Sequence, residues 1–323
     1  MNILITGGAG FMGSHFVRFM ADRYPNDLIV NYDKLTYAGD LENLKEVEGK
    51  KNYTFVKGDV CDFEKLLKVL KGVDVVFHFA AESHVDNSIG NSLVFTKTNT
   101  YGTHMLLEAA RLSSVKKFVH VSTDEVYGDI EEGSFKESDM LNPNNPYSAS
   151  KAGAEMIARS YFKTYRMPVI IVRGNNVYGP NQYPEKIIPK FITNILEGKK
   201  VPLHGDGSNI RTFIHVLDFA EAVDTVFRKG KTGEIYNIGT SDEISNLELT
   251  RLILKKMEKD ETRIDFVKDR PFNDKRYSID LTRIKALGWK PQHTLEKEMD
   301  KLIQWYKDNK AWWKKKKTDN ETA

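Results

Sequence analysis

Two adjacent carboxylic acids, Asp124 and Glu125, follow a run of β-branched and aromatic residues in the segment KFVHVSTDEVYG. Keeping two acids at the end of a buried strand costs desolvation free energy. Eliminating water across two neighbouring carbons requires one group that removes a proton alpha to a ketone and another that protonates the departing hydroxyl. A pair of carboxyls with separated pKa values can fill those two roles. The plain alternative is an acidic turn that caps a helix.

A tyrosine and a lysine, Tyr147 and Lys151, lie four residues apart in NPYSASKAGAEM, so a helix would place them on one face. An ammonium near a phenol favours the phenolate, which predicts a lowered pKa for Tyr147. Such a tyrosine can take a proton from a substrate hydroxyl while a hydride leaves the same carbon. This spacing is common on helices of all kinds. It indicates a catalytic tyrosine only in combination with a cofactor-binding turn and the strand that ends in Thr123.

A glycine turn of this kind opens the chain. ILITGGAGFMGSHFV places Gly7, Gly10 and Gly13 between an expected strand and an expected helix, whose first amides would face a pyrophosphate. Asp33 follows twenty residues after Gly13, where a ribose-binding acid is expected. Because a carboxylate repels a 2′-phosphate, Asp33 favours NAD over NADP, although the neighbouring Lys34 weakens that preference. A tight turn without a ligand is the alternative.

The third expected strand is followed by KGDVCD, which contains Asp59 and Val60. This position commonly borders an adenine. Asp59 is equally consistent with a plain helix cap, and both interpretations stay open.

The elements that would position these residues alternate along the first half of the chain. Apolar, mostly unalternating runs indicate parallel strands covered on both faces, and segments with helical spacing separate them. The sequence therefore predicts a doubly wound, Rossmann-like α/β sheet in an NAD-binding domain, residues 1–175. The expected strands are 2–6, 28–32, 53–57, 74–80, 117–123 and 168–174.

The pattern changes after residue 175, where proline and turn residues cluster and short strands mix with helices. We predict a smaller, mixed α/β substrate lobe over residues 176–323, partly interwoven with the first domain. Its helices are expected near 185–197, 216–229, 245–258 and 294–308.

Composition places the chain among ordinary globular proteins, with 40% hydrophobic and 29% charged residues. The net charge of +3 does not argue for nucleic acid. A single cysteine, Cys61, the absence of a signal-peptide pattern and the absence of an 18-residue apolar run favour a cytoplasmic protein and no membrane partner. The lysine run 314–317 is expected to be a solvated, frayed terminus, with contact to an anionic partner as the alternative.

These motifs together resemble the extended short-chain dehydrogenase/reductase family from TGGAGFMGS to LGWKP. The resemblance implies that Tyr147 and Lys151 act with the hydroxyl of Thr123 against an NAD held by the glycine turn. A narrower resemblance, to nucleoside-diphosphate-glucose 4,6-dehydratases, rests on six motifs in order: DKLTYAG, FAAESHVDNS, STDEVYGD, YSASK, YGPNQYPEKIIP and DRPFNDKRY.

The narrower resemblance implies a hydro-lyase with a defined sequence of steps. Tyr147 would deprotonate the glucose 4-hydroxyl as hydride passes from C4 to NAD. Glu125 would remove the C5 proton, and Asp124 would protonate the C6 hydroxyl as water leaves. Hydride would return to C6 and C5 would be reprotonated, which gives a 4-keto-6-deoxy sugar. NAD would be regenerated in each cycle and stay bound.

The resemblance also implies two sets of contacts. Those with the cofactor would come from Gly7, Gly10, Phe11, Met12, Gly13, Asp33, Lys34, Leu35, Thr36, Asp59, Val60, Phe79, Ala80, Ala81, Ser83, Thr98, Tyr147, Lys151 and Val177. Those with the nucleotide sugar would come from Ser83, Thr123, Asn176, Lys186, Ile187, Pro202, Leu203, His204, Arg211, Asn246 and Arg270. Both arginines suit a diphosphate because a guanidinium binds phosphate oxygens in bidentate fashion. Glu82 and His84 could suggest a metal, but no second His/Cys cluster supports one, and no metal is expected.

Three departures concern the substrate. The chain reads GNNVYGP with Val177 in place of a second asparagine, RPFND in place of RPGHD, and His204 where a tyrosine is common. These resemble the UDP-glucose 4,6-dehydratase segment of rhamnose synthases. UDP-glucose is therefore slightly favoured, with dTDP-glucose also accepted, because one methyl group changes binding by only roughly 1–3 kcal/mol.

Alternative functions remain on the same fold. A UDP-sugar 4-epimerase or decarboxylase does not need both Asp124 and Glu125, and a non-catalytic NAD-binding regulator does not need Tyr147 and Lys151. Helices near 93–112 and 147–165 resemble those that pair in family dimers, so a homodimer is expected. The chain's own second lobe could instead cover their apolar positions.

Overall fold

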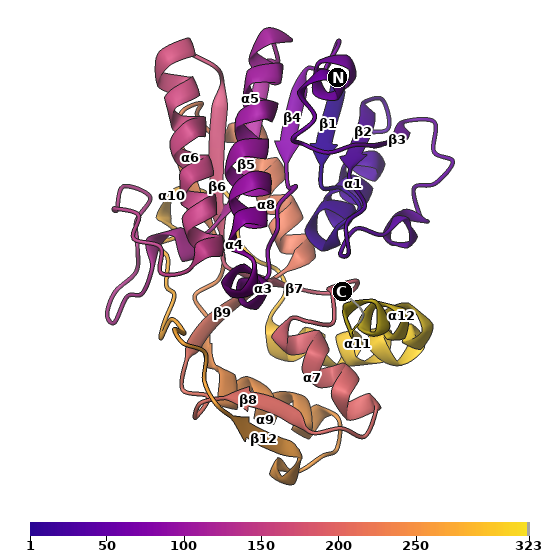
Figure 1. Cartoon of the computed structure of the whole chain (residues 1–323), viewed down its shortest axis with the longest axis vertical. Helices are drawn as coiled ribbons and strands as arrows, with labels where there is room; N and C mark the ends of the chain where they lie inside the picture. Colours follow the sequence, from indigo (N-terminus) through magenta and orange to yellow (C-terminus); the bar gives the residue numbers. More distant parts are fainter. Residues whose placement is uncertain (322–323) are drawn as a thin grey trace.

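Buried runs of β-branched residues form a seven-stranded parallel sheet in the computed structural model, which describes residues 1–321 (Figure 1). The predicted doubly wound α/β fold is confirmed, and its first six strands lie close to where the sequence placed them. In spatial order the strands are β10 (Ile235–Ile238), β6 (Val169–Gly174), β5 (Lys117–Thr123), β4 (Val75–His78), β1 (Asn2–Thr6), β2 (Leu28–Asp33) and β3 (Tyr53–Lys57).

Helices cover both faces of this sheet, and each face has its own apolar core. Ile3, Phe16 and Phe77 lie in one core cluster, and Leu4, Leu106 and Phe118 lie in the other. The first cluster involves α1 (Phe11–Arg23), α8 (Val216–Lys229) and α10 (Thr282–Ala286). The second involves α2 (Phe63–Val69), α5 (Gly102–Leu112) and α6 (Pro146–Tyr165). Within residues 1–321 no helix is both long and apolar enough to cross a membrane.

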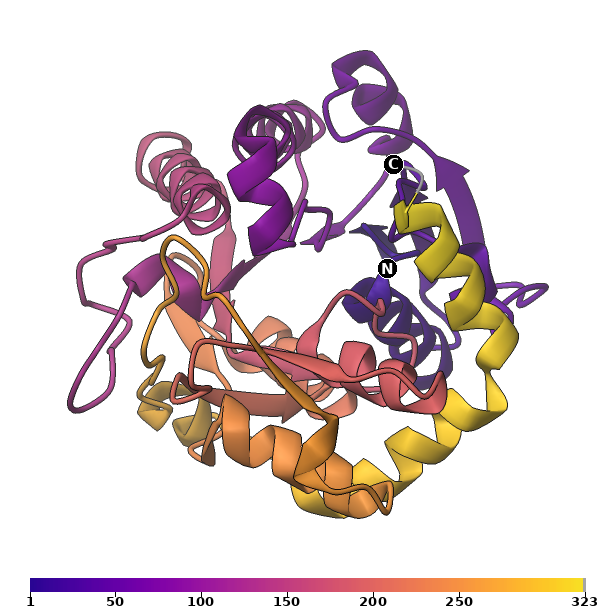
Figure 2. The same cartoon turned by 60° about the horizontal axis from the view of Figure 1, so that its bottom comes forward.

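A smaller lobe packs below the carboxyl ends of the strands (Figures 1 and 2). Its core includes Phe191, Leu203, Leu249 and Ile303. It contains β7 (Asn176–Tyr178), β8 (Val201–His204), β9 (Ile210–His215), β11 (Glu243–Ser245), β12 (Ile264–Val267), α7 (Ile187–Leu196), α9 (Asn246–Lys256) and α11 (Leu295–Asp308). Short helical segments are η1 (Leu41–Leu44), α3 (Val85–Gly90), α4 (Ser92–Phe95), η2 (Thr96–Tyr101), η3 (Asp124–Tyr127) and η4 (Glu261–Arg263).

The second half of the chain also returns to the main sheet. β10 pairs with β6 in parallel, and α8 packs against α1 and β6. The domain boundary between residues 175 and 176 stays a prediction, and residues 322–323 of the second unit lie outside the described part of the chain.

The C-terminal lysine run differs from its prediction. It forms part of α12 (Lys310–Glu321), in which Trp312 and Trp313 are buried and Lys316 is only 4% exposed. Lys314 and Lys315 are exposed, as expected of a solvated run. The prediction of a frayed terminus is wrong because the two tryptophans anchor the helix, and a lysine four residues after Trp312 then lies on the buried face.

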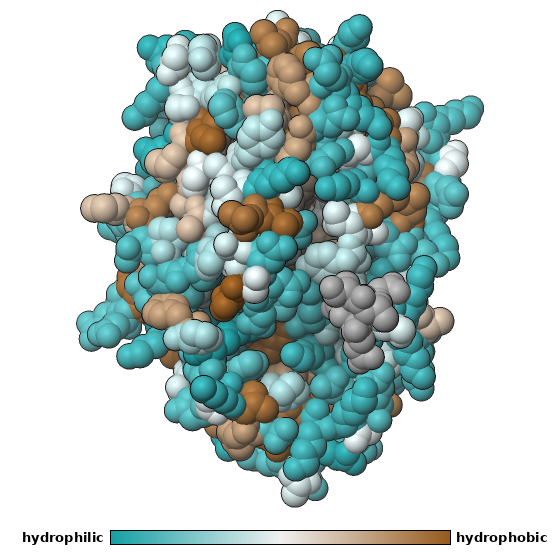
Figure 3. Space-filling view, viewed as in Figure 1, coloured by the Kyte–Doolittle hydropathy of each residue, from teal (hydrophilic) through white to brown (hydrophobic). Residues whose placement is uncertain are grey.

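Large apolar side chains remain exposed on the outer surface of α4, η2 and α6. Leu93 is 80% exposed, and Val94, Tyr101, Met156 and Tyr165 are also well exposed. Figure 3 shows brown patches among teal side chains on the face where these elements lie. Within the described part of a single chain, the second lobe leaves these side chains exposed.

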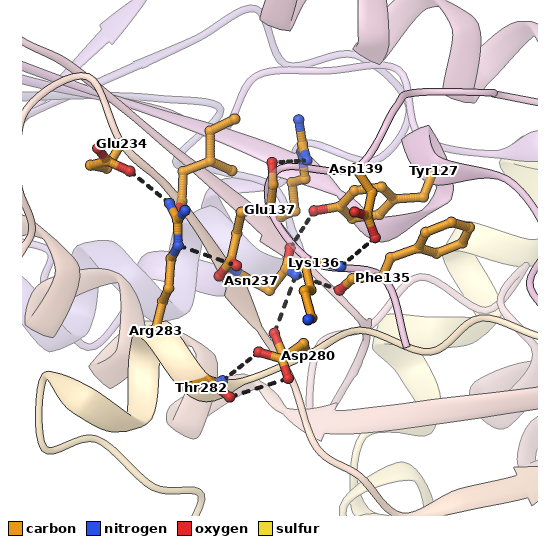
Figure 4. Close-up of polar contacts among 12 residues, drawn as sticks. Tyr127, Phe135, Lys136, Glu137, Asp139, Glu234, Asn237, Asp280, Thr282 and Arg283 are labelled. Atoms are coloured by element: carbon orange, nitrogen blue, oxygen red, sulfur yellow. Dashed lines mark hydrogen bonds and ion pairs between the residues drawn. The ribbon is translucent and has the colours of Figure 1, made fainter. Parts of the chain in front are cut away.

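The turn that carries the two acids is anchored to the main sheet through Tyr127. Its hydroxyl donates a hydrogen bond to Asn237 Oδ1 on β10 (2.9 Å), and Asn237 Nδ2 donates to the carbonyls of Phe135 (3.0 Å) and Asp280 (3.2 Å; Figure 4). Glu137 accepts from the Asn237 backbone N–H (3.1 Å). The turn, strand β10 and the segment 135–139 therefore form one connected polar network.

A buried ion pair joins the helix that carries Tyr147 and Lys151 to the sheet. Arg173 on β6 is 1% exposed, and it donates three hydrogen bonds to the fully buried carboxylate of Glu155 on α6, at 2.6–3.1 Å. Arg173 also lies 4.5 Å from the ring centroid of Tyr127. The pair links the helix and the acid-bearing turn.

Glu155→Gln should lower the free energy of unfolding by roughly 3–5 kcal/mol, because it leaves a buried guanidinium without its counter-charge. Chemical denaturation measures this change. The matched control is Glu261→Gln, which breaks the exposed Arg251–Glu261 pair and should cost about 1 kcal/mol or less. Equal losses for the two variants would contradict the assigned importance of the buried pair.

Candidate active site

A cleft of about 430 Å³ lies between the two lobes at the carboxyl ends of the parallel strands. This edge of an open α/β sheet is where ligands bind in such folds. All the residues predicted to contact cofactor or substrate line the cleft except Leu35, and all the predicted catalytic residues line it except Asp124. Leu35 packs against the apolar core, and Asp124 is buried directly behind the cleft wall.

The glycine turn between β1 and α1 leaves room for a phosphate. Gly7 has φ +72°, and a Cβ there would come within 2.5 Å of the Ala80 nitrogen. A Cβ on Gly10 would meet only the Gly7 carbonyl oxygen at 3.4 Å and would otherwise enter the open space of the cleft. The first amides of α1 have no partner within the helix, so they are available to an anion at this cradle. The residues therefore fit a dinucleotide.

Asp33 lies at the end of β2 and faces the same turn. Its Oδ2 accepts the Ala9 N–H (2.9 Å) and its Oδ1 accepts the Leu35 N–H (2.8 Å). Burial raises the pKa of Asp33, and these two backbone hydrogen bonds oppose the rise. The carboxylate is thereby held in one orientation at the cleft surface, as recognition of a ribose diol requires.

Lys34 and Asp59 form an ion pair with a distance of 2.8 Å between Nζ and Oδ2. Asp59 therefore offsets the positive charge of Lys34, which was the reason for a weaker preference for NAD over NADP. Asp59 Oδ1 also accepts the Cys61 N–H (2.9 Å), whereas the cap of α2 is Asp62, which accepts the Lys65 N–H. The helix-cap interpretation of Asp59 is therefore wrong, and its position beside an adenine stays a prediction.

Asp124 is almost fully buried, with 2% exposure. Its Oδ2 accepts from Asn175 Nδ2 (2.7 Å), and its Oδ1 accepts from the Thr123 hydroxyl (3.3 Å). Burial raises the pKa of Asp124 to about 7; the Asn175 hydrogen bond opposes this rise, and the neighbouring Glu125 charge adds to it. Near neutral pH this carboxyl can hold a proton and give it up.

Glu125 lines the cleft beside Asp124. Asn145 Nδ2 donates to its Oε2 at 3.5 Å. Burial raises the pKa of Glu125 as well, while the positive charge of Lys186 opposes the rise. The two acids thus have different surroundings, with a buried amide partner for Asp124 and a nearby ammonium for Glu125. Such asymmetry suits one proton donor and one proton acceptor.

Tyr147 and Lys151 occupy the first turns of α6, which begins with an Asn145–Ser148 capping box and Pro146. The predicted lowering of the Tyr147 pKa is contradicted. Burial and the negative charge of Glu125 raise this pKa, and a hydrogen bond with Thr123 only partly offsets them. Lys151 instead donates to the Val121 carbonyl (2.7 Å), and burial lowers its pKa to about 8.

Cationic side chains cross or line the cleft from the second lobe. Lys186 Nζ donates to the Ser83 carbonyl (2.6 Å), and Arg270 pairs with Asp86 on α3, at 2.6 Å from Nε to Oδ1. Arg211 stacks on Tyr277 and donates to the Asp274 carbonyl (2.8 Å). The structure therefore brings the predicted diphosphate residues to one side of the cleft, and Arg270 must exchange Asp86 for a phosphate in order to bind it.

The residues predicted to lie beside the nucleobase come together at the far end of the cleft. Pro202, Leu203 and His204 belong to β8, and Asn246 begins α9. His204 Nδ1 is buried without a hydrogen-bond partner. Phe272, from the departing RPFND motif, lines the same cleft and is 47% exposed. His204 and Phe272, like the third departure Val177, therefore lie at positions that a ligand can reach.

Sequence reasoning missed several residues of the site. Asn175 contacts Asp124, Asn145 contacts Glu125, and Glu185 lines the cleft while accepting from the Tyr37 hydroxyl (3.1 Å). Asn175 had a signal, because it directly follows strand β6 beside the predicted Asn176. Asn145 directly precedes Pro146 in NPYSASK, which is typical of a helix start, and Glu185 belongs to the motif YGPNQYPEKIIP, so both also had a signal.

The described part of the chain contains no cluster of metal-ligating side chains. Among the side chains that the structure describes, no group of three or more His, Cys, Asp or Glu residues has the arrangement to hold a metal ion.

Known proteins are similar to this chain in sequence and fold. The family described as GDP-mannose 4,6 dehydratase matches residues 4–302. A trifunctional UDP-glucose 4,6-dehydratase/3,5-epimerase/reductase of Arabidopsis thaliana is 49% identical over 97% of this chain and 48% of its own length. A dTDP-D-glucose 4,6-dehydratase of Bos taurus is 46% identical over 97% of this chain and 90% of its own.

A solved structure agrees with these relatives. The dTDP-glucose 4,6-dehydratase of Streptomyces venezuelae, crystallised with NAD bound, superposes with a TM-score of 0.96 at 46% identity, over 98% of this chain and all of that one. The chain spans about half the length of the plant relatives it matches. The family resemblance of the motifs is confirmed, and the chain belongs to the GDP-mannose 4,6-dehydratase family.

Proposed function

We propose that the protein is an NAD-dependent hydro-lyase that converts a nucleoside-diphosphate-glucose to its 4-keto-6-deoxy sugar, as a step toward rhamnose or another deoxysugar. The observation that carries the proposal is the adjacent acid pair beside Tyr147 in a dinucleotide-type cleft, with Asp124 buried and Glu125 half-buried in the cleft lining. The activities named for the Arabidopsis, Bos taurus and Streptomyces relatives support it. A 4-epimerase or a decarboxylase does not need both acids.

NAD is the proposed cofactor. Support comes from the cradle at Gly10, the first amides of α1 and the fixed carboxylate of Asp33. When bound, NAD supplies a hydride acceptor that is regenerated in the cycle, and its cationic ring favours the phenolate of a neighbouring tyrosine. The negative charge of Asp59, paired with Lys34, opposes the attraction of a 2′-phosphate to that lysine.

The catalytic residues would divide the proton transfers among them. Tyr147 takes the proton of the sugar 4-hydroxyl as C4 is oxidised, and Thr123 orients that hydroxyl. Glu125 then removes the C5 proton, which the new 4-ketone acidifies. Asp124, with a pKa of about 7, gives a proton to the C6 hydroxyl as water departs. Return of the hydride to C6 and of a proton to C5 completes the product.

The substrate is proposed to be UDP-glucose, with dTDP-glucose also accepted. His204 and Phe272 at the base end of the cleft support a preference that differs from that of enzymes with tyrosine and glycine at these positions. Comparison of kcat/KM for the two nucleotide sugars decides the preference.

Incubation of the purified protein with UDP-glucose or dTDP-glucose, without added reductant, should yield a 4-keto-6-deoxy sugar. The reaction needs no reductant because the hydride is stored and returned. The product is followed by its near-ultraviolet absorbance in alkali and by mass spectrometry, as loss of one water. Formation of the C4 epimer, or no reaction with either sugar, would rule out the dehydratase.

Glu125→Gln should lower product formation by roughly 100-fold or more, because a general base is lost. Oxidation at C4 does not use Glu125, so reduced nicotinamide should accumulate on the variant and be visible in its absorbance. Glu132→Gln, at an exposed position in the following loop, is the control and should behave as wild type. Normal turnover by Glu125→Gln would show that another residue removes the C5 proton.

We also propose that the protein is a homodimer and works in the cytoplasm. The exposed apolar side chains of α4, η2 and α6 support a second copy of this chain as their cover. The single cysteine, Cys61, suits a reducing compartment.

Leu93→Glu should convert the dimer to a monomer, because it places a charge on the most exposed apolar position of this surface. Light scattering coupled to gel filtration measures the mass. Met140→Glu is the control: Met140 is 86% exposed but lies outside these helices, so the variant should stay dimeric. A wild-type mass of one chain would contradict the proposal.

A further inference from the structure

The C-terminal helix α12 contacts both lobes, and each of its faces has a different partner. Trp313 packs in the core of the second lobe, and Lys317 donates to Asn194 Oδ1 (2.9 Å) and Glu197 Oε2 (3.0 Å) at the end of α7. Trp312 belongs to the same core, but its indole N–H and the Lys316 ammonium, four residues further on, both bond to the N-terminal domain. In Figure 2 the yellow end of the chain runs alongside the indigo and purple N-terminal elements.

The contact with the N-terminal domain is an ion pair between a buried lysine and a half-buried aspartate. Lys316 Nζ lies 2.6 Å from Asp40 Oδ2, and it also faces the Trp312 ring, 4.8 Å from the ring centroid. Trp312 Nε1 donates to Asn43 Oδ1 (3.2 Å). Burial raises the pKa of Asp40, but the hydrogen bond from Lys316, the Glu42 N–H and the positive charge of Lys316 together outweigh this and leave the pKa below its usual value. The carboxylate is therefore ionised at neutral pH.

Asp40 and Asn43 in turn hold the glycine turn. The Asp40 backbone N–H and Asn43 Nδ2 both donate to the Ala9 carbonyl, each at 3.0 Å. The Ala9 N–H is the group that fixes Asp33 (2.9 Å). Residues 34–39, which connect Asp33 to Asp40, supply Lys34, Thr36, Ala38 and Gly39 to the cleft. One chain of contacts thus runs from Lys316 through Asp40 and Ala9 to the ribose-binding acid.

The same helix reaches the second side of the cleft. The Tyr183 hydroxyl donates to the Lys316 carbonyl (2.9 Å), and the Tyr183 ring packs edge-on against Tyr37, with 5.2 Å between centroids. Both Asn181 and Tyr183 line the cleft, and Asn181 Nδ2 donates to Asn43 Oδ1 (3.2 Å). α12 therefore ties the loop 34–43 to the segment 181–183 on the opposite lobe.

We propose that α12 is a clasp for the dinucleotide, and that Lys316 is a positioning residue that retains the cofactor by holding the loop 34–43 and the glycine turn closed around it. The inference rests on the proposed function, because a cofactor that is regenerated in each cycle must not leave between turnovers. Without the ion pair, Asp40 and the loop can move away from Ala9, and the ribose side of the site opens. Lys316 touches neither the sugar nor the reacting atoms.

The test is the affinity and release of NAD in the full-length protein. Lys316→Met keeps the length of the side chain and removes its charge. We expect the NAD dissociation constant to rise about tenfold, the change that corresponds to losing one charge-assisted hydrogen bond. NAD bound after purification should fall, and kcat at saturating added NAD should return to the wild-type value. Calorimetric titration of protein stripped of cofactor and release after rapid dilution measure the affinity and the rate.

Lys314→Met is the matched control, because it removes the same charge from an exposed position in the same helix that is not among the charges acting on Asp40. It should bind NAD as wild type does. Asp40→Asn is a second variant, which tests the same contact if Lys316→Met does not fold. In the wild type, Asp40 Oδ1 accepts the Glu42 N–H (2.9 Å), and an asparagine oxygen can still accept it. The asparagine lacks the negative charge that pairs with Lys316. It should raise the NAD dissociation constant in the same direction.

The outcomes separate this inference from the proposed function. If wild type binds NAD and the two variants bind it equally well, the clasp is refuted even if their thermal stability falls, since that result indicates a purely structural helix. If wild type itself binds no NAD, the proposed function and the clasp fail together. If wild type binds NAD but makes no keto sugar, the dehydratase fails while the variants' dissociation constants still decide the clasp.

Discussion

Desolvation of two neighbouring carboxyl groups at the end of β5 is the constraint on which the site depends. Removing Asp124 and Glu125 from water is unfavourable, and the fold offsets that cost with directed donors: Asn175 and Thr123 for the first acid, Asn145 for the second. The donors come from β5, β6 and the start of α6, so the acids keep their place only while the sheet and that helix are packed together. The Arg173–Glu155 pair and the Tyr127–Asn237 bond stabilise this packing from behind.

Parallel strand topology explains why the cofactor-type turn and the acids meet. β1 lies between β2 and β4, and the chain crosses from one side of the sheet to the other at this point. The carboxyl ends of β1, β2, β4, β5 and β6 therefore open into one cleft, where a dinucleotide can lie across the crevice. Residues separated by more than a hundred positions, such as Gly10 and Thr123, line the same cavity as a result.

The second lobe closes the cleft through charged contacts with the first. Lys186 reaches the Ser83 carbonyl, Arg270 pairs with Asp86, and Lys316 pairs with Asp40. Two of these three cations are predicted substrate ligands, so a bound diphosphate would compete for them. Lys316 is different, because its partner belongs to the cofactor side and its ammonium is almost fully buried.

The sequence by itself determined the sheet, the glycine turn, Asp33 and the acid pair. Hydrophobic runs and glycine spacing are local properties, and they specify strands and turns directly. The dispersed motifs then identified the family. The sequence could not predict which of the terminal lysines are exposed and which is buried. A run of lysines has the same local pattern whether or not a distant acid pairs with one of them.

Only the tertiary structure decided which groups each functional side chain contacts. It brought Asn175 to Asp124, directed Lys151 to the Val121 carbonyl, and packed Lys316 against Asp40 across 276 residues of chain. The raised pKa of Tyr147 follows from burial beside Glu125, which the spacing of tyrosine and lysine along a helix cannot reveal. Local spacing fixes which residues share a helix face, whereas burial and long-range partners set their charge, and these exist only after the chain has folded.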